Sequence, residues 1–224
     1  MPRVARIVVP GAPHHVMQRG NDLQDVFFVR GDRRVYLSML KDQAARFGLC
    51  IHGFCLMTNH VHLVATPTDE LSLAKAIGTT HFLYSQYVNR MHGRGGHLWQ
   101  GRFYSCALDK EHLWQALRYV ERNPVRAGIV RRAWDYEWSS AAIHTGLAAA
   151  GGVVDLAVWR ATWRPSDWKR LLARSQDKEG MSQLRLSTSR GRPLGSDSFL
   201  RKAEAALGRR VRALPVGRPR KHET

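Results

Sequence analysis

The chain has 224 residues, which allows one domain with an extension or two small domains. A hydrophobic fraction of 44% and a charged fraction of 24% are typical of a globular protein with a real core. The formal net charge of +17 argues against a neutral metabolic enzyme and indicates a polyanionic partner. No apolar run approaches the ~20 residues needed to span a bilayer. Three cysteines without zinc-type spacing fit reduced thiols, so we expect a cytoplasmic protein.

Alternating and helical periodicities predict a mixed fold. In chain order we expect a strand within residues 11–20, a helix capped by Asp32, and strands over 50–57 and 60–66. A helix over 72–91, a strand over 102–108 and a helix over 110–122 follow. Pro124 is expected to end the last helix by pushing Asn123 out of helical geometry. This order predicts an α+β ferredoxin-like sandwich, an antiparallel sheet with helices packed on one face.

The composition changes after about residue 146, where a small-residue linker begins. We expect a compact domain over residues 1–146, a helical extension over 147–180, and a basic tail over 181–224 that can be partly disordered. Residues 185–224 carry +8 of the net charge, and one helix is expected over 197–207. The C-terminal segment is therefore predicted to hold a polyanion.

His60 and His62 lie two residues apart in a predicted strand, so both imidazoles point to the same face of the sheet. Two neighbouring imidazoles can share a metal ion. The alternative is a pair of partly exposed histidines without a ligand, and an isolated His-x-His favours that alternative.

Tyr119 lies on the flank of an apolar helix stripe, where its hydroxyl can be exposed, and Asn123 lies one turn further on the same side. If this helix crosses the sheet face, the Asn123 oxygen could complete a metal site with His60 and His62. The alternative is a boundary tyrosine and an Asn that only ends the helix. Spacing alone slightly favours the alternative.

Several ordered motifs resemble the REP-associated branch of the single-tyrosine HUH transposases. Residues 55–64 (CLMTNHVHLV) are similar to the family's His-hydrophobic-His segment, and residues 15–21 (HVMQRGN) resemble its first strand. Residues 98–103 (LWQGRF) and 117–128 (LRYVERNPVRAG) are similar to later motifs of that branch. The likeness runs from about residue 10 to residue 146, and motifs in this order make it specific.

The resemblance implies a metal-dependent reaction on DNA. His60 and His62 would bind Mg²⁺ or Mn²⁺, with Asn123 as third ligand where related transposases use Gln, and Tyr119 would be the nucleophile. Its hydroxyl would attack single-stranded DNA at hairpin-forming repeats, leaving a 5′-phosphotyrosine and a free 3′-OH for rejoining. The metal would polarise the scissile phosphate. The sequence does not choose between the two metals.

Arginine and aromatic side chains are candidates for holding the DNA by phosphate pairing and base stacking. Two Gly-Arg-Pro elements resemble AT-hook cores, which lie in a minor groove, but they fit equally a nonspecific Arg-rich tail. The first element departs from an AT-hook because Leu194 follows its proline. The candidate DNA-binding residues are Arg19, Trp99, Arg102, Arg192, Arg218 and Arg220.

We therefore predict a DNA transposase that nicks and rejoins single-stranded DNA. It is expected to act as a monomer, with a homodimer as the alternative, in the bacterial cytoplasm beside the nucleoid. One competing hypothesis is a noncatalytic DNA-binding protein with the same fold. A phosphoesterase acting on small nucleotides is a weaker one, because paired His-x-Thr motifs are absent from the sequence.

Overall fold

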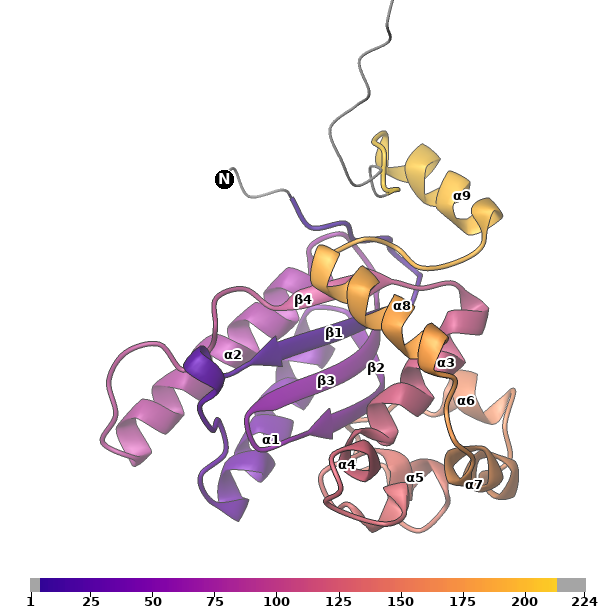
Figure 1. Cartoon of the computed structure of the whole chain (residues 1–224). Helices are drawn as coiled ribbons and strands as arrows, with labels where there is room; N and C mark the ends of the chain where they lie inside the picture. Colours follow the sequence, from indigo (N-terminus) through magenta and orange to yellow (C-terminus); the bar gives the residue numbers. More distant parts are fainter. Residues whose placement is uncertain (1–4, 213–224) are drawn as a thin grey trace, which may run out of the picture.

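The computed structural model describes residues 5–212, which fold around one four-stranded antiparallel sheet (Figure 1). The strand order is β2-β3-β1-β4. This order arises from two interleaved β-α-β units, the arrangement of ferredoxin-like folds, and it agrees with the predicted α+β class. The strands are β1 (His14–Arg19), β2 (Leu49–Leu56), β3 (His60–Pro67) and β4 (Tyr104–Ala107).

Helices cover both faces of the sheet. The first face packs against α1 (Arg30–Arg46) and α2 (Ser72–Met91), which lie behind the sheet in Figure 1. The opposite face packs against α3 (Lys110–Glu121) and α8 (Lys178–Arg190). The prediction that helices cover only one face was wrong. The strands bury apolar side chains on both faces, so each face needs a cover.

The core on the first face comes from alternate strand residues. Val16 of β1 and Leu63 of β3 are fully buried against Tyr36 of α1 and Ile77 of α2. On the other face, Val64 of β3 is buried in a second cluster that includes α3 and α8. The alternation sends His15, Met17 and Arg19 of β1 to this second face, together with His60 and His62 of β3.

Two helix ends differ from the predictions. α1 begins at Arg30, because the Asp32 carboxylate accepts bonds from the backbone N–H groups of Phe28 and Val29 at 2.7 and 2.9 Å and closes the first turn from inside the helix. Beyond α3, the break falls at Arg122 and not at Asn123, which opens the short helix α4 (Asn123–Arg126). The expectation for Asn123 was wrong because a proline is well tolerated in the first turn of a new helix.

Several further elements complete the fold. Trp159 and Trp168 are buried against α3, together with the carboxylate of Glu121. The predicted helix over 197–207 is present. The elements are η1 (Asn21–Leu23), η2 (Ala133–Asp135), α5 (Ala141–His144), α6 (Ala157–Arg160), α7 (Pro165–Ala173) and α9 (Asp197–Leu207).

Helix α8 was not predicted, although both of its ends carry local signals. The Asp177 side chain accepts from the backbone N–H groups of Glu179 and Gly180, and Gly191 ends the helix with a left-handed φ of 63°. Leu184 and Thr188 are buried where α8 crosses β4 and β1 (Figure 1). The start of the predicted basic tail, which lies in α8, therefore packs on the sheet face that carries the two histidines.

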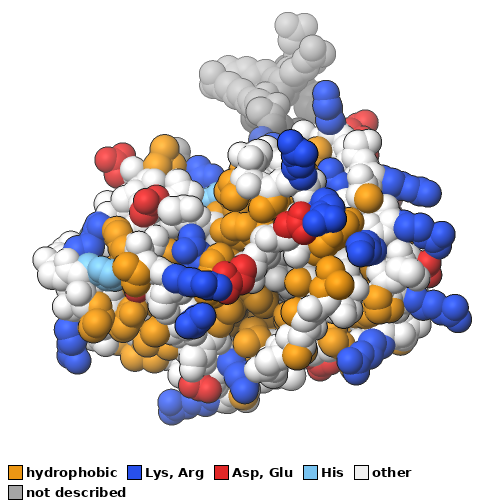
Figure 2. All heavy atoms as spheres, turned by 90° about the horizontal axis from the view of Figure 1, so that it is seen from below, with side chains coloured by type: hydrophobic (Ala, Val, Ile, Leu, Met, Phe, Trp, Pro, Cys, Tyr) orange, Lys and Arg blue, Asp and Glu red, His pale blue; other side chains and the backbone are white. Residues whose placement is uncertain are grey.

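Basic side chains are spread over the face of the molecule that Figure 2 shows. Figure 2 shows Lys and Arg side chains standing out around the face seen from below, with fewer Asp and Glu between them. This agrees with the net charge of +17. Within residues 5–212, none of the helices has the length and apolar character required to cross a membrane.

Candidate active site

Strand β3 presents its two histidines side by side. The ring centroids of His60 and His62 lie 5.1 Å apart, and their planes are nearly perpendicular. His60 Nδ1 lies 2.7 Å from the Asn59 side-chain oxygen, which must accept, so His60 carries its proton on Nδ1 and keeps a lone pair on Nε2. His62 Nδ1 lies 3.0 Å from Nε2 of His15 on β1. Both histidines therefore have their Nδ1 atoms engaged.

The imidazoles are held neutral by their surroundings. Burial, together with the nearby Arg19 and Arg126 cations, lowers the pKa of His60 to about 4. Burial is also the first cause that places the pKa of His62 well below its usual range, with His15 and His60 adding to the effect. A neutral imidazole needs to lose no proton before it binds a metal.

Tyr119 packs its ring against the histidines from α3. Its ring centroid lies 5.7 Å from that of His62 and 5.6 Å from that of His15, edge to face in both cases. Two guanidinium groups flank the same ring, that of Arg126 at 4.2 Å and that of Arg185 at 5.6 Å from the centroid. Arg185 Nε also donates to the Tyr119 hydroxyl at 3.2 Å. Only 5% of Tyr119 is exposed, less than the flanking position had suggested, because α8 covers its ring.

These side chains line one open groove of about 750 Å³ between the sheet, α3, α4 and α8. The structure brings together the five sequence candidates Arg19, His60, His62, Tyr119 and Asn123 on the walls of this groove. The groove also contains residues that the sequence did not identify, which include Arg126, Ser182, Arg185 and Ser189.

Two polar atoms in the groove lack a partner within the described part of the chain. Nε of Arg19 and Nδ2 of Asn123 are buried donors without an acceptor. Buried donors are rarely left unpaired, so these two suit a ligand that brings acceptors, such as the oxygens of a phosphate. The Asn123 Oδ1 atom accepts from Arg126, which fixes the orientation of the amide.

The donor set fits a divalent metal ion. The Nδ1 contacts of His60 and His62 leave Nε2 as the ligating atom of each ring, and the Asn123 Oδ1 atom has a second lone pair. Over residues 5–212, no three His, Cys, Asp or Glu side chains converge to hold a metal. The Asn123 amide oxygen is the candidate third ligand in this groove, and two nitrogens with oxygen ligands suit Mn²⁺ or Mg²⁺.

The other candidate DNA-binding residues fall in different places. Trp99 is buried in the core, and its indole N–H donates to the His81 carbonyl at 3.1 Å, so its ring is not available to stack on a base. Arg102 is exposed and lines a second groove with Arg6, Arg190 and Arg192, which meets the first groove at Ser189. Arg218 and Arg220 lie outside the described residues.

The first Gly-Arg-Pro element does not form an extended strip. Gly191 is the left-handed C-cap of α8, and Arg192 Nη1 donates to the Val211 carbonyl at 3.3 Å. The element thus ends a helix and turns the chain toward α9. Its arginine still lines the second groove.

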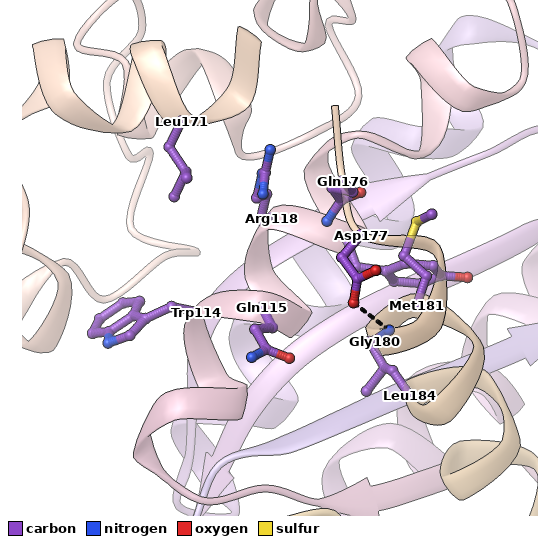
Figure 3. Close-up of a pocket in the computed structure, with 10 residues that line it drawn as sticks. Trp114, Gln115, Arg118, Leu171, Gln176, Asp177, Gly180, Met181 and Leu184 are labelled. Carbon is purple, nitrogen blue, oxygen red and sulfur yellow. Dashed lines mark hydrogen bonds between the residues drawn. The ribbon is translucent and has the colours of Figure 1, made fainter. Parts of the chain in front are cut away.

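A smaller cavity of about 240 Å³ lies on the other side of Tyr119, between α3, α7 and α8 (Figure 3). Trp114 and Leu171 form part of its wall, and the dashed bond from Gly180 to the Asp177 side chain marks the start of α8. Tyr119 lines both this cavity and the larger groove.

Sequence reasoning missed His15, Arg126, Arg185 and Thr188. His15 and Arg126 stood inside the quoted motifs, so their local signal was available. Arg185 and Thr188 reach the site only because α8 folds back over β1 and β4. The caps of α8 at Asp177 and Gly191 could have predicted the helix but not its place on the sheet.

Comparison with known proteins places the chain in a family. The sequence model described as "Transposase IS200 like" matches residues 10–123. A solved REP-associated tyrosine transposase bound to a REP hairpin is 17% identical with a TM-score of 0.52, covering 70% of this chain and 96% of its own. At that identity the likeness shows the fold alone.

A crystal structure of a proposed transposase of Deinococcus radiodurans R1 is 20% identical, with a TM-score of 0.37, and covers 54% of this chain and 97% of that one. This second likeness is too distant to carry an argument. None of the curated proteins matches the chain. The resemblance seen in the motifs is nevertheless confirmed by the family match, which spans half of the sequence and includes His60, His62, Tyr119 and Asn123. The chain belongs to the IS200-like transposase family.

Proposed function

We propose that this protein cleaves and rejoins single-stranded DNA at hairpin-forming repeats through a phosphotyrosine bond to Tyr119. The observation that carries the proposal is the meeting of Tyr119, His60, His62 and Asn123 in one groove, with guanidinium groups against the tyrosine. A hairpin substrate is supported by the structural relative, which is bound to a REP hairpin.

In the proposed reaction, the Tyr119 oxygen attacks the scissile phosphorus and loses its proton. The bond from phosphorus to the 3′ oxygen breaks, and that oxygen takes up a proton to become a free 3′-OH. The 5′ phosphate remains on Tyr119, and attack by a 3′-OH on this bond reverses the step and rejoins DNA. Arg185 donates to the Tyr119 oxygen and stabilises the negative charge that grows there as the proton leaves.

His60, His62 and Asn123 would hold the metal ion of the family. A bound Mg²⁺ or Mn²⁺ supplies a Lewis acid that polarises the scissile phosphate. Arg19 and Arg126 contribute positive charge beside the groove, and the unpaired Nε of Arg19 can donate to a phosphate oxygen.

The DNA on one side of the cleavage point would follow the second groove. Arg6, Arg102, Arg190 and Arg192 line that groove, which continues from the first at Ser189. We propose that residues 1–146 form the catalytic domain, while 147–180 and 181–224 add helices and DNA contacts. The protein would act in the cytoplasm beside the nucleoid, as a monomer whose groove is completed by its own α3 and α8.

The polarity of the covalent product tests this proposal. A hairpin oligonucleotide labelled at its 3′ end should stay attached to the protein in a denaturing gel when Mn²⁺ is added, while a 5′ label should be released. Tyr119→Phe should abolish attachment, and Tyr87→Phe, which changes a tyrosine beneath the opposite face of the sheet, should retain it. Attachment through the 5′ label, or attachment by Tyr119→Phe, would overturn the proposal.

A noncatalytic DNA-binding protein is the second candidate. The bond from Arg126 to Asn123 Oδ1 favours it, because this bond engages one lone pair of the expected third ligand. That protein would bind hairpin DNA with strong salt dependence and give no covalent product with any divalent metal.

A further inference from the structure

A chain of hydrogen bonds connects α8 to the metal-binding candidates on β3. It runs from Thr188 on α8 through His15 on β1 to His62 on β3. We propose that Thr188 is a positioning residue, which fixes through His15 the tautomer of His62 so that Nε2 presents its lone pair to a divalent cation. This inference rests on the proposed function, which names His62 as a ligand but assigns no role to His15 or Thr188.

The direction of the chain is set at Thr188. Its hydroxyl donates its only proton to the Leu184 carbonyl one turn earlier, at 2.8 Å. The hydroxyl oxygen can then only accept from His15, whose Nδ1 lies 2.7 Å away. Nδ1 of His15 must therefore carry a proton.

His15 transmits this constraint because it is neutral. The residue is only 1% exposed, and its hydrogen bonds in the described residues go to Thr188 and His62, not to a carboxylate that would stabilise a cation. A neutral imidazole with its proton on Nδ1 has a bare Nε2. That Nε2 lies 3.0 Å from Nδ1 of His62, so it accepts and His62 donates.

His62 is left with its proton on Nδ1 and a lone pair on Nε2. The planes of the two imidazoles differ by only 10°, as expected when the N–H and the lone pair lie in the planes of both rings. Metal-binding histidines commonly have the second ring nitrogen fixed by such an outer partner, and removing the partner typically costs 10–100-fold in affinity. Here the outer partner is another histidine, whose own orientation is fixed by α8.

The arrangement gives α8 a role besides its arginines. Thr188 is 2% exposed and lies where α8 crosses the sheet, close to β1. His60 needs no such relay, because Asn59 beside it in sequence fixes its Nδ1 proton locally. His60 is thus oriented by its neighbour in sequence, and His62 by a segment about 125 residues further along the chain.

The tautomer of His62 can be observed directly in the metal-free protein. Nitrogen-15 NMR of the histidine rings at pH 7.5 distinguishes protonated from bare ring nitrogens. In the unmodified protein, His62 should show protonated Nδ1 and bare Nε2. Thr188→Val keeps the shape but removes the acceptor, so His15 and His62 should each become mixtures of both tautomers, whereas Thr188→Ser should retain the original pattern.

Binding of Mn²⁺ provides the second measurement, followed by electron paramagnetic resonance without DNA. Thr188→Val should weaken binding about tenfold or more, and Thr188→Ser should restore it. If Thr188→Val does not fold, His15→Gln and His15→Leu replace the two Thr188 variants. Gln can both donate to Thr188 and accept from His62, while Leu can do neither. Only His15→Leu should therefore lose the Nδ1-protonated form of His62 and bind Mn²⁺ more weakly.

Two results would overturn the inference. One is a proton on Nε2 of His62 in the unmodified metal-free protein, and the other is an unchanged tautomer and unchanged Mn²⁺ affinity in Thr188→Val. The proposed function fails separately, if the unmodified protein forms no covalent product with DNA. If the tautomers change in Thr188→Val and not in Thr188→Ser, but no variant binds Mn²⁺, the relay is supported and the metal role of His62 is contradicted.

Discussion

The Tyr119 hydroxyl accepts a 3.2 Å hydrogen bond from Nε of Arg185, a residue 66 positions later in the chain. This bond joins the proposed nucleophile on α3 to the basic helix α8, which crosses the same sheet face. Besides the DNA contacts proposed for the basic helix α8, one of its arginines therefore contacts the oxygen proposed to attack DNA.

Removing Arg185 should slow cleavage more than it weakens DNA binding. Arg185→Ala deletes the donor to the Tyr119 oxygen, and the loss of one such donor typically costs about 100-fold in rate. Single-turnover cleavage at saturating hairpin DNA would measure this. Arg170→Ala removes an exposed arginine of α7 that lines neither groove and should cleave at the unmodified rate. Equal rates for the two variants would show that the bond has no part in the reaction.

Arg102 should act on affinity and not on the chemical step. It is exposed in the second groove, away from Tyr119. Each phosphate contact to single-stranded DNA contributes a slope of about 0.7 to the fall of log affinity with log salt. Arg102→Ala should lower the measured slope by about that amount and leave cleavage at saturating DNA unchanged. Arg34→Ala, which changes an arginine of α1 behind the opposite face of the sheet, provides the control. An unaltered salt slope in Arg102→Ala would exclude a contact between Arg102 and a DNA phosphate.

Glu121 should be essential for stability. Its buried carboxylate accepts bonds from Ser140 at 2.6 Å, from His144 at 2.5 Å and from Trp168 at 2.8 Å. Glu121→Gln keeps the shape but turns an N–H toward these donors, which should cost about 3 kcal/mol of unfolding free energy. Urea denaturation measures the loss, with the exposed Glu111→Gln of the same helix as control. A change within ~0.5 kcal/mol of the control would contradict this role.

The protein should lose stability in mild acid because of buried neutral histidines. Burial lowers the pKa of His81 to about 3, and burial also lowers the pKa of His14 to about 4. When the pH falls below about 6.5, histidines of the unfolded chain bind protons while these two do not. Stability should therefore be complete above pH 6.5 and fall between pH 6.5 and 4.

Each of these histidines should account for a loss on the order of 1 kcal/mol between pH 7.5 and pH 5.5. Denaturant titrations at the two pH values measure it. His81→Gln should lower stability at both values but reduce the difference between them. If the pH dependence of His81→Gln equals that of the unmodified protein, His81 is not held neutral in the fold.

Much of the site could be predicted because its signals are local. The two-residue spacing of His60 and His62 sets their common face through the strand pleat, and the four-residue spacing of Tyr119 and Asn123 sets their common side. The helix over 72–91 was predicted with its observed ends because its apolar stripe is long and regular. The other residues of the site could not be predicted, because they are brought there by contacts between segments that are distant in sequence. The periodicity of β3 contained no information about which helix covers His62, and nothing around Thr188 indicated that its hydroxyl meets His15.

Trp99 was predicted to contact DNA, but the structure buries it. An aromatic residue three positions from an arginine in a basic protein resembles a base-stacking residue, but its buried indole N–H has its partner inside the core, the His81 carbonyl. Side-chain burial of this kind depends on how the connection between α2 and β4 folds back on the sheet.

We propose that Tyr119 carries the covalent bond to DNA. The most direct measurement starts by incubating the protein with a single-stranded DNA hairpin and Mn²⁺. A nuclease then trims the attached DNA to a short remnant joined through its 5′ phosphate. The protein is digested, and its peptides are mapped by tandem mass spectrometry. We predict a mass increase equal to that remnant on the Tyr119 residue of the peptide, absent without metal. A modified peptide that carries the remnant on any other residue, or an unmodified Tyr119 peptide alongside cleaved DNA, would contradict the account.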